Sequence, residues 1–277
     1  MRAPALFVSL LVSVLVLAPV IACGGDSDDD DGNRDPDASG GAIADAATPA
    51  DAAPPDASPA DAGAIDAGGL PLSGFGALAG DCDVIDDEIT DPFPSLFESA
   101  IAFDHPFTDE EASALTDGGR EMLADGNAGG SSLLSEVFAF ELLARCELAP
   151  LVKTETEIEY DAPGAITDLL VAIDGEKIGV SVTRAVAFPF DAPYTVEQAS
   201  ELLTRKLSDI LESTNNVSEG DRWRKQILAV LAFGPDHVTS LTAALAEIDP
   251  AIRADTIVWI LVTDGTDDFI YCDGPCR

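Results

Sequence analysis

The chain has 277 residues, of which 51 are Asp or Glu and 14 are Lys or Arg, so its net charge at pH 7 is −37. A basic patch is the first feature of a nucleic-acid-binding protein, and this composition disfavours that class. A strongly negative chain is instead soluble and repels other copies of itself.

The first 22 residues predict a lipoprotein signal peptide. Arg2 precedes an apolar run from Ala5 to Ala22, and the run is interrupted by Pro19, which argues against a membrane-spanning helix of about 20 residues. Val20-Ile21-Ala22-Cys23 resembles a bacterial lipobox, in which the cysteine is acylated and becomes the new N-terminus. The resemblance implies a partner, the lipid bilayer, and an exported lipoprotein at the outer membrane, the cell surface or in the periplasm.

Residues 23–74 predict a disordered tether. They are rich in Asp, Ala, Pro and Gly, and residues 24–69 contain no aromatic side chain. Such a segment cannot bury enough apolar surface to offset the entropy of the chain. The run Asp28–Asp31 lacks the glycine turn and the distal glutamate of a calcium loop, so we expect it to be solvated charge.

Residues 75–130 predict a mostly helical extension. Apolar residues between Phe93 and Phe103 are numerous enough to dock on a core. Thr108 and Glu111 have the spacing of a capping box, which predicts a helix that continues to about Asp125. We expect this extension to pack on a separate α/β domain in residues 131–277.

That domain begins with a predicted helix, capped by Ser131 or Ser132 and ending near Cys146. The stretch from Val152 to Val186 then predicts a three-stranded antiparallel meander. Two runs that alternate polar and apolar residues flank a more continuous apolar run, and turn signals separate the three. The second turn, Asp174-Gly175, predicts a tight hairpin.

Helices and strands alternate after the meander. Thr195 caps one amphipathic helix, and two continuous apolar runs predict strands that are buried on both faces. The predicted fold class is therefore α/β, with a helix-β-β-β-helix-β core in which helices flank the meander and the strands that continue it. The predicted elements are a helix over Val196–Ser213, a strand over Gln226–Phe233, a helix over Asp236–Ile248, a strand over Thr256–Thr263 and a short edge strand over Phe269–Tyr271.

Four cysteines remain besides Cys23. In an exported protein an even number favours two disulfides. The short spacing of Cys272 and Cys276 favours a local bridge, which would leave Cys82 to pair with Cys146. A C-terminal tail that is bridged back to Cys82 or Cys146 remains the alternative.

The order of a helix, a meander, a helix and a strand resembles that of the PD-(D/E)XK, or restriction-endonuclease-like, superfamily. In that family an Asp opens the second strand of the meander, a Glu-x-Lys lies in the third, and a Glu on the preceding helix often joins them. The resemblance matches Asp168 to the first Asp and Glu141 to the helix Glu, with Ser181 and Thr183 where the second carboxylate and the lysine belong. It implies a Mg²⁺ or Mn²⁺ site at Glu141 and Asp168 that activates water.

The stretch from Thr154 to Tyr271, about half of the chain, is also similar to an uncharacterised family. The shared segments are TETEIEY, GVSVTRA, LLTRKL and Trp223 with Lys225–Leu228. This resemblance implies that Ser181 and Thr183 are ordinary features of such a domain rather than a local loss.

Each candidate residue also has a purely structural interpretation. Asp168 is placed to bond the nearby turn, and Glu141 to pair with Arg145 one helical turn away. Two surface features also have both a functional and a structural interpretation. A row of acids on one predicted strand face could supply a displaced metal ligand or be solvated charge. Two basic clusters around a tryptophan could stack nucleic-acid bases or form surface ion pairs. These residues are Glu155, Glu157 and Glu159, and Arg205, Lys206, Arg222, Trp223, Arg224 and Lys225.

Ser181 and Thr183 at the catalytic positions and the acidic composition favour a non-catalytic module that binds an unknown protein or ligand without a cofactor. The alternative is an atypical metal-dependent phosphodiesterase or nuclease. In that case Mg²⁺ or Mn²⁺ would be held by Glu141 and Asp168, with Glu157 as a further candidate ligand. The residue in place of the lysine would be Ser181, Thr183 or Arg184.

Overall fold

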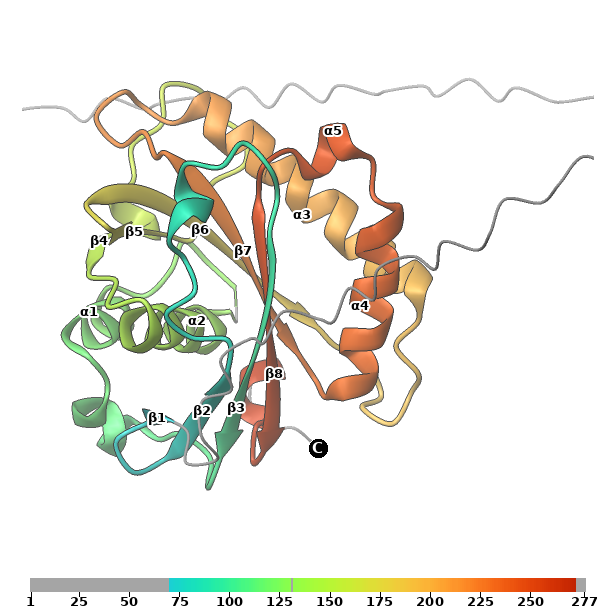
Figure 1. Cartoon of the computed structure of the whole chain (residues 1–277). Coiled ribbons are helices and arrows are strands. Elements are labelled where there is room, and N and C mark those ends of the chain that lie inside the picture. Colours follow the sequence, from blue (N-terminus) through green and yellow to red (C-terminus); the bar gives the residue numbers. More distant parts are fainter. Residues whose placement is uncertain (1–69, 131, 273–277) are drawn as a thin grey trace, which may run out of the picture. The chain divides into compact units, whose positions relative to one another are not determined.

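The computed structural model describes residues 70–130 and 132–272, and all of these lie within one structural unit. It is an α/β structure in which helices flank a single mixed sheet, as predicted (Figure 1). The predicted signal peptide, Cys23, most of the predicted tether and Cys276 lie outside the described residues. Among the described residues, no helix is both long enough and apolar enough to cross a membrane.

The sheet has eight strands in the order β1-β2-β3-β8-β7-β6-β5-β4. The strands are β1 (Leu70–Pro71), β2 (Gly76–Gly80), β3 (Leu96–Phe103), β4 (Leu151–Thr154), β5 (Leu169–Ile173), β6 (Glu176–Ala185), β7 (Lys225–Ala232) and β8 (Ile257–Gly265). The helices are α1 (Asp117–Asp125), α2 (Leu133–Cys146), α3 (Val196–Asn216), α4 (Pro235–Glu247), α5 (Pro250–Arg253) and α6 (Asp268–Tyr271). Three short 3-10 helices are η1 (Asp87–Ile89), η2 (Asp109–Ala114) and η3 (Glu155–Glu157).

The centre of the sheet is parallel. Strand β6 pairs with β7, β7 with β8 and β8 with β3, all in the same direction. Because a crossover between parallel strands is right-handed, two successive steps in one direction put both connecting helices on one face. Helices α3 and α4 accordingly share one face, and α1 and α2 cover the other (Figure 1).

Burial on both faces explains the continuous apolar runs of the central strands. All eight residues of β7 are buried, with Ile227 and Leu231 packed under α2 and Leu228 and Val230 packed under α3 and α4. Trp259 of β8 is fully buried on the α2 side.

Antiparallel strands complete both edges. Strands β4, β5 and β6 pair antiparallel in sequence order, and Asp174-Gly175 joins β5 to β6. Both turn residues have positive φ, 50° and 82°, which is the geometry of the Asp-Gly hairpin turn. At the opposite edge β1 pairs with β2 and β2 with β3.

The N-terminal extension differs from the prediction because it contributes strands to the same sheet. Residues Leu96–Phe103 form β3, which pairs with β8 over its whole length. Order also begins before Phe75, since β1 starts at Leu70 and Leu72 is fully buried. The capping box at Thr108 is present, but it begins the 3-10 helix η2, and Thr116 caps a separate helix α1.

One predicted strand is shorter than expected and another is wrong. The alternating TETEIEY run leaves the sheet after Thr154, because Thr154 and Glu157 form a capping box that begins η3. Glu155, Glu157 and Glu159 therefore do not share a strand face. Residues Phe269–Tyr271 belong to the short helix α6 rather than to an edge strand.

The predicted bridge between Cys82 and Cys146 is present, with an S–S distance of 2.00 Å. It joins the loop after β2 to the last residue of α2. Cys272 is also disulfide-bonded.

Candidate functional site

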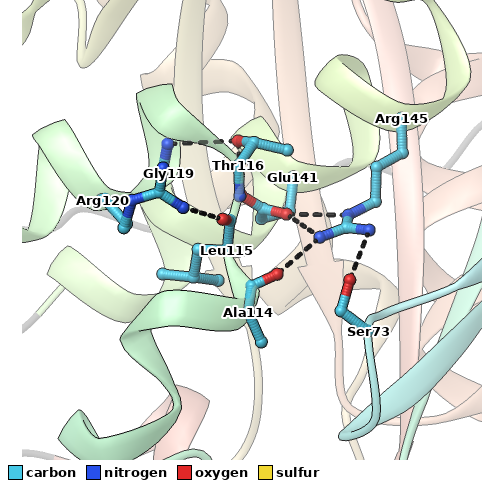
Figure 2. A network of polar contacts seen from close by, with 8 residues as sticks. All are labelled: Ser73, Ala114, Leu115, Thr116, Gly119, Arg120, Glu141 and Arg145. Atoms are coloured by element: carbon cyan, nitrogen blue, oxygen red, sulfur yellow. Dashed lines mark hydrogen bonds and ion pairs between the residues drawn. The ribbon is translucent and has the colours of Figure 1, made fainter.

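Glu141 lies in a closed polar network rather than beside Asp168 (Figure 2). Its carboxylate is fully buried in α2. Oε1 accepts the backbone N–H of Thr116 at 2.8 Å and its hydroxyl at 2.7 Å, while Oε2 accepts two guanidinium N–H groups of Arg145 at 2.8 Å. The predicted i+4 pair with Arg145 is therefore present, and both carboxylate oxygens are occupied.

The same network joins four segments of the chain. Arg145 donates to the carbonyl of Ala114 at the end of η2 and to the hydroxyl of Ser73 before β2 (Figure 2). Gly119 of α1 lies so close that a Cβ there would collide with Oε1 of Glu141. The geometry assigns Glu141 a structural role, and it does not contribute to a site with Asp168, Ser181 and Thr183.

Asp168 stands immediately before β5 and closes the pairing with β6. Its backbone N–H donates to the carbonyl of Val180 at 3.1 Å, and its carboxylate accepts the N–H of Val182 at 2.6 Å. These two bonds bracket Ser181, which brings Asp168 opposite Ser181. The predicted turn-bonding role is thus replaced by a bond across the strand pair.

Charged groups surround Asp168. Burial raises the pKa of its carboxyl to about 7, and the attraction of Lys206 on α3 works against this rise. Repulsion from Glu136 on α2 and Glu155 on η3 raises the pKa further, while the bond from Val182 lowers it. Two further carboxyl groups and one ammonium, from three other elements, are therefore close enough to affect the ionisation of Asp168.

The two additional acids have their own partners. Glu136 is only 3% exposed, and its Oε1 accepts the side-chain N–H of Asn127 at 3.2 Å. Glu155 accepts the backbone N–H of Ala128 at 2.5 Å. Burial raises the pKa of Glu155, the bond from Ala128 lowers it, and repulsion from Glu136 raises it. Among the described residues, the oxygens of Asp168, Glu136 and Glu155 do not all come within 4.8 Å of one another, so these acids do not form a ready-made metal site.

Ser181 and Thr183 face α3 from strand β6. Val180 and Val182 point into the core under α2, so the alternation of the strand turns Ser181 and Thr183 to the opposite face. Their exposed fractions are 5% and 8%. Ser181 lies opposite Asp168, and neither Ser181 nor Thr183 carries a positive charge.

Sequence reasoning missed Glu136 and the role of Lys206. Helix α2 is buried almost all round, so the apolar periodicity of its sequence did not mark Glu136 as an inward-facing residue. Lys206 was grouped with Arg205 as surface charge because its proximity to Asp168 depends on how α3 crosses β6.

The other predicted surface features also differ. Trp223 is 6% exposed and donates its indole N–H to Thr214, so it does not offer a stacking platform. Lys225 is 2% exposed and is bound by backbone carbonyls. Among the described residues, the three carboxylates whose oxygens come within 4.8 Å of one another are Glu121, Asp125 and Glu157, and all are exposed.

Comparison with known proteins places the chain in no family. No protein-family model matches it, and no solved structure matches it. It is 38% identical over 181 residues to a protein of Dictyostelium discoideum named AAC-rich mRNA clone AAC4 protein. The match covers 63% of this chain, which spans only a quarter of the length of that relative.

Proposed function

We propose that this chain is an exported lipoprotein, held at a lipid bilayer through an acylated Cys23, whose α/β domain is a non-catalytic binding module of the nuclease-like type. The antiparallel order β4-β5-β6 between α2 and α3, with β7 parallel to β6, supports the comparison with the PD-(D/E)XK superfamily. The lipobox-like segment supports the anchor.

One observation carries the non-catalytic assignment. Both carboxylate oxygens of Glu141 accept hydrogen bonds from Thr116 or Arg145, which argues against Glu141 as a metal ligand. With Ser181 and Thr183 at the positions of the second carboxylate and the lysine, Asp168 is the one family position that keeps a carboxylate near the expected site.

A second candidate function rests on the acids around Asp168. A phosphodiesterase or nuclease with a relocated ligand set would use Asp168, Glu136 and Glu155, with Lys206 as the positive group. The raised pKa of Asp168 supports it, because desolvation and the neighbouring acids disfavour the charged carboxylate and a divalent cation would stabilise that form. A bound cation would supply Lewis-acid activation of water, and Lys206 would orient the attacked phosphate.

Calorimetric titration of the full chain with MgCl₂ and MnCl₂ separates the two functions. The binding module predicts no saturable heat, and the same result for Asp168→Asn. Micromolar binding that is lost in Asp168→Asn but kept in Asp125→Asn, which alters the exposed acidic cluster, would overturn the first proposal. Cleavage of bis-p-nitrophenyl phosphate by the same samples would then establish the second.

Metabolic labelling with a radioactive fatty acid tests the anchor independently. We expect the full chain expressed in a Gram-negative bacterium to incorporate the label and to sediment with membranes, and Cys23→Ser to do neither. Equal labelling of both proteins would contradict attachment at Cys23.

A further inference from the structure

The parallel strands β6 and β7 end side by side, at Ala185 and Ala232. Each is followed by a segment rich in aromatic residues: the loop from 186 to 195 leads from β6 to α3, and Phe233-Gly234 leads from β7 to α4. Figure 1 shows the first of these loops beside the start of α4. In open α/β sheets, ligands bind beyond the carboxyl ends of the strands.

A cavity of about 470 Å³ lies between these segments. Two pairs of stacked rings line it, Phe190 with Phe233 at a centroid distance of 4.8 Å and Tyr194 with His237 at 4.7 Å. His237 and Phe233 also form an edge-to-face pair, with ring centroids 5.9 Å apart. Small-molecule sites have this size and this aromatic lining.

Three polar atoms in the wall of the cavity have no hydrogen-bond partner within the described part of the chain. They are both ring nitrogens of His237 and the hydroxyl of Tyr194. His237 is only 6% exposed, and an unpaired polar group in such a position costs about 1–3 kcal/mol. Burial lowers the pKa of His237 and raises that of Tyr194 to about 12, so both are neutral at pH 7.

The rim of the cavity is acidic. Asp191 and Asp236 are exposed and line it, on a chain whose net charge is −37. The faces of aromatic rings carry negative potential and attract organic cations. We propose that this cavity binds a small organic cation, an ammonium group carried on an apolar or aromatic body. The two aspartates attract the charge, and the four rings contact the cation and its body.

An adjoining cavity of about 410 Å³ offers the opposite chemistry. It shares Tyr194 but is also lined by Arg184 and Arg205, which would attract an anion. The test therefore compares three ligands of similar size that share a phenyl ring and differ in charge: the cation benzylammonium, neutral benzyl alcohol and the anion benzoate. The proposed site is separate from Asp168 and does not depend on the function proposed above.

Proton NMR of the full chain provides an internal reference, because the sequence has two histidines. His237 lines the cavity, whereas His105 is exposed and paired with Glu111 at 3.2 Å. We expect benzylammonium to shift the ring C–H signals of His237 saturably without moving those of His105. Benzyl alcohol should bind more weakly, and benzoate should leave His237 unchanged.

A pair of double variants separates local charge from the field of the whole protein. Asp191→Asn with Asp236→Asn should weaken benzylammonium binding about tenfold. Asp104→Asn with Asp174→Asn removes the same charge from exposed positions elsewhere and should leave binding unchanged. Equal affinity for all three ligands, tighter binding of benzoate, an unmoved His237 or equal weakening in both double variants would each overturn the proposal.

Discussion

The ammonium of Lys225 in β7 binds the backbone carbonyl of Asp91 at 2.7 Å, although 134 residues separate them. The carbonyls of Glu88 and Phe93 complete the group at 2.6 and 3.0 Å. Lys225 is only 2% exposed, so a charged group is buried in a cage of backbone oxygens. It thereby attaches the loop between β2 and β3 to the start of β7.

We predict that Lys225→Met lowers the free energy of unfolding by about 3 kcal/mol, because three backbone carbonyls lose a charged donor whose side chain is buried. Denaturant unfolding measures the loss, and hydrogen exchange should rise in residues 86–94. Lys177→Met is the control. Lys177 donates to a single carbonyl, that of Gly220, at a more exposed position, so its loss should stay below about 1 kcal/mol. Equal losses in the two variants would contradict a special role for the cage.

We predict a comparable loss for Glu141→Gln. The neutral amide leaves the guanidinium of Arg145, whose side chain is 17% exposed, without its charged partner and gives Thr116 a weaker acceptor. Removing one member of a buried pair costs about 3 kcal/mol. The exposed Glu121→Gln on α1 should leave unfolding unchanged. If Glu141→Gln were as stable as the wild type, the structural role of the network would be wrong.

The pKa of Asp168 predicts how stability depends on pH. Folding raises this pKa from 3.8 to about 7, so the folded protein holds the proton more tightly than the unfolded chain does. The contribution of the protonated Asp168 carboxyl to the free energy of unfolding is complete below about pH 4 and is lost as the pH rises through 7. The loss is at most about 4 kcal/mol.

Asp168→Asn keeps an acceptor for the N–H of Val182 but does not titrate. We therefore expect it to exceed the wild type in stability by about 1–3 kcal/mol at pH 8 and to match it near pH 4. Urea unfolding at both values measures this difference. Asp174→Asn, on the exposed hairpin turn, should show no such change with pH. A difference for Asp168→Asn that is the same at pH 4 and pH 8 would mean that Asp168 ionises normally.

The bridge between Cys82 and Cys146 spans 64 residues. In the chain-entropy account, closing a loop of this length stabilises the folded state by about 4 kcal/mol. We expect Cys82→Ser with Cys146→Ser to lose about this much in denaturant unfolding. Reductant added to the double variant then reports the contribution of the bridge at Cys272, and a double variant as stable as the oxidised wild type would contradict the prediction.

The sequence by itself determined the elements whose signals are local. Helix α3 begins after Thr195, as predicted, and the capping box with Gln198 is present there. The Asp174-Gly175 turn and the strands β7 and β8 were also predicted from local signals. The turn follows from the dihedral preferences of two adjacent residues, and burial on both faces requires a continuous run of apolar residues.

Tertiary structure decided the elements whose partners are distant. Leu96–Phe103 became a strand because β8 offers it a parallel partner, and Ser99 there accepts the indole N–H of Trp259 at 2.8 Å across 160 residues. The alternating run after Thr154 looked like a strand, but with its local capping box satisfied it leaves the sheet.

The same distinction between local and tertiary signals applies to the residues around Asp168 and to the aromatic cavity. Asp168 was identified through the resemblance to the PD-(D/E)XK superfamily, which matches it to the Asp that opens a strand. Its neighbours Glu136, Glu155 and Lys206 come from three other elements, and their approach is set by how α2 and α3 cross the sheet. Tyr194 and His237 likewise meet only because β6 and β7 run parallel and end together. Periodicity and capping describe contacts a few residues apart, whereas ionisation and ligand binding depend on distances in space, which the packing of helices on the sheet decides.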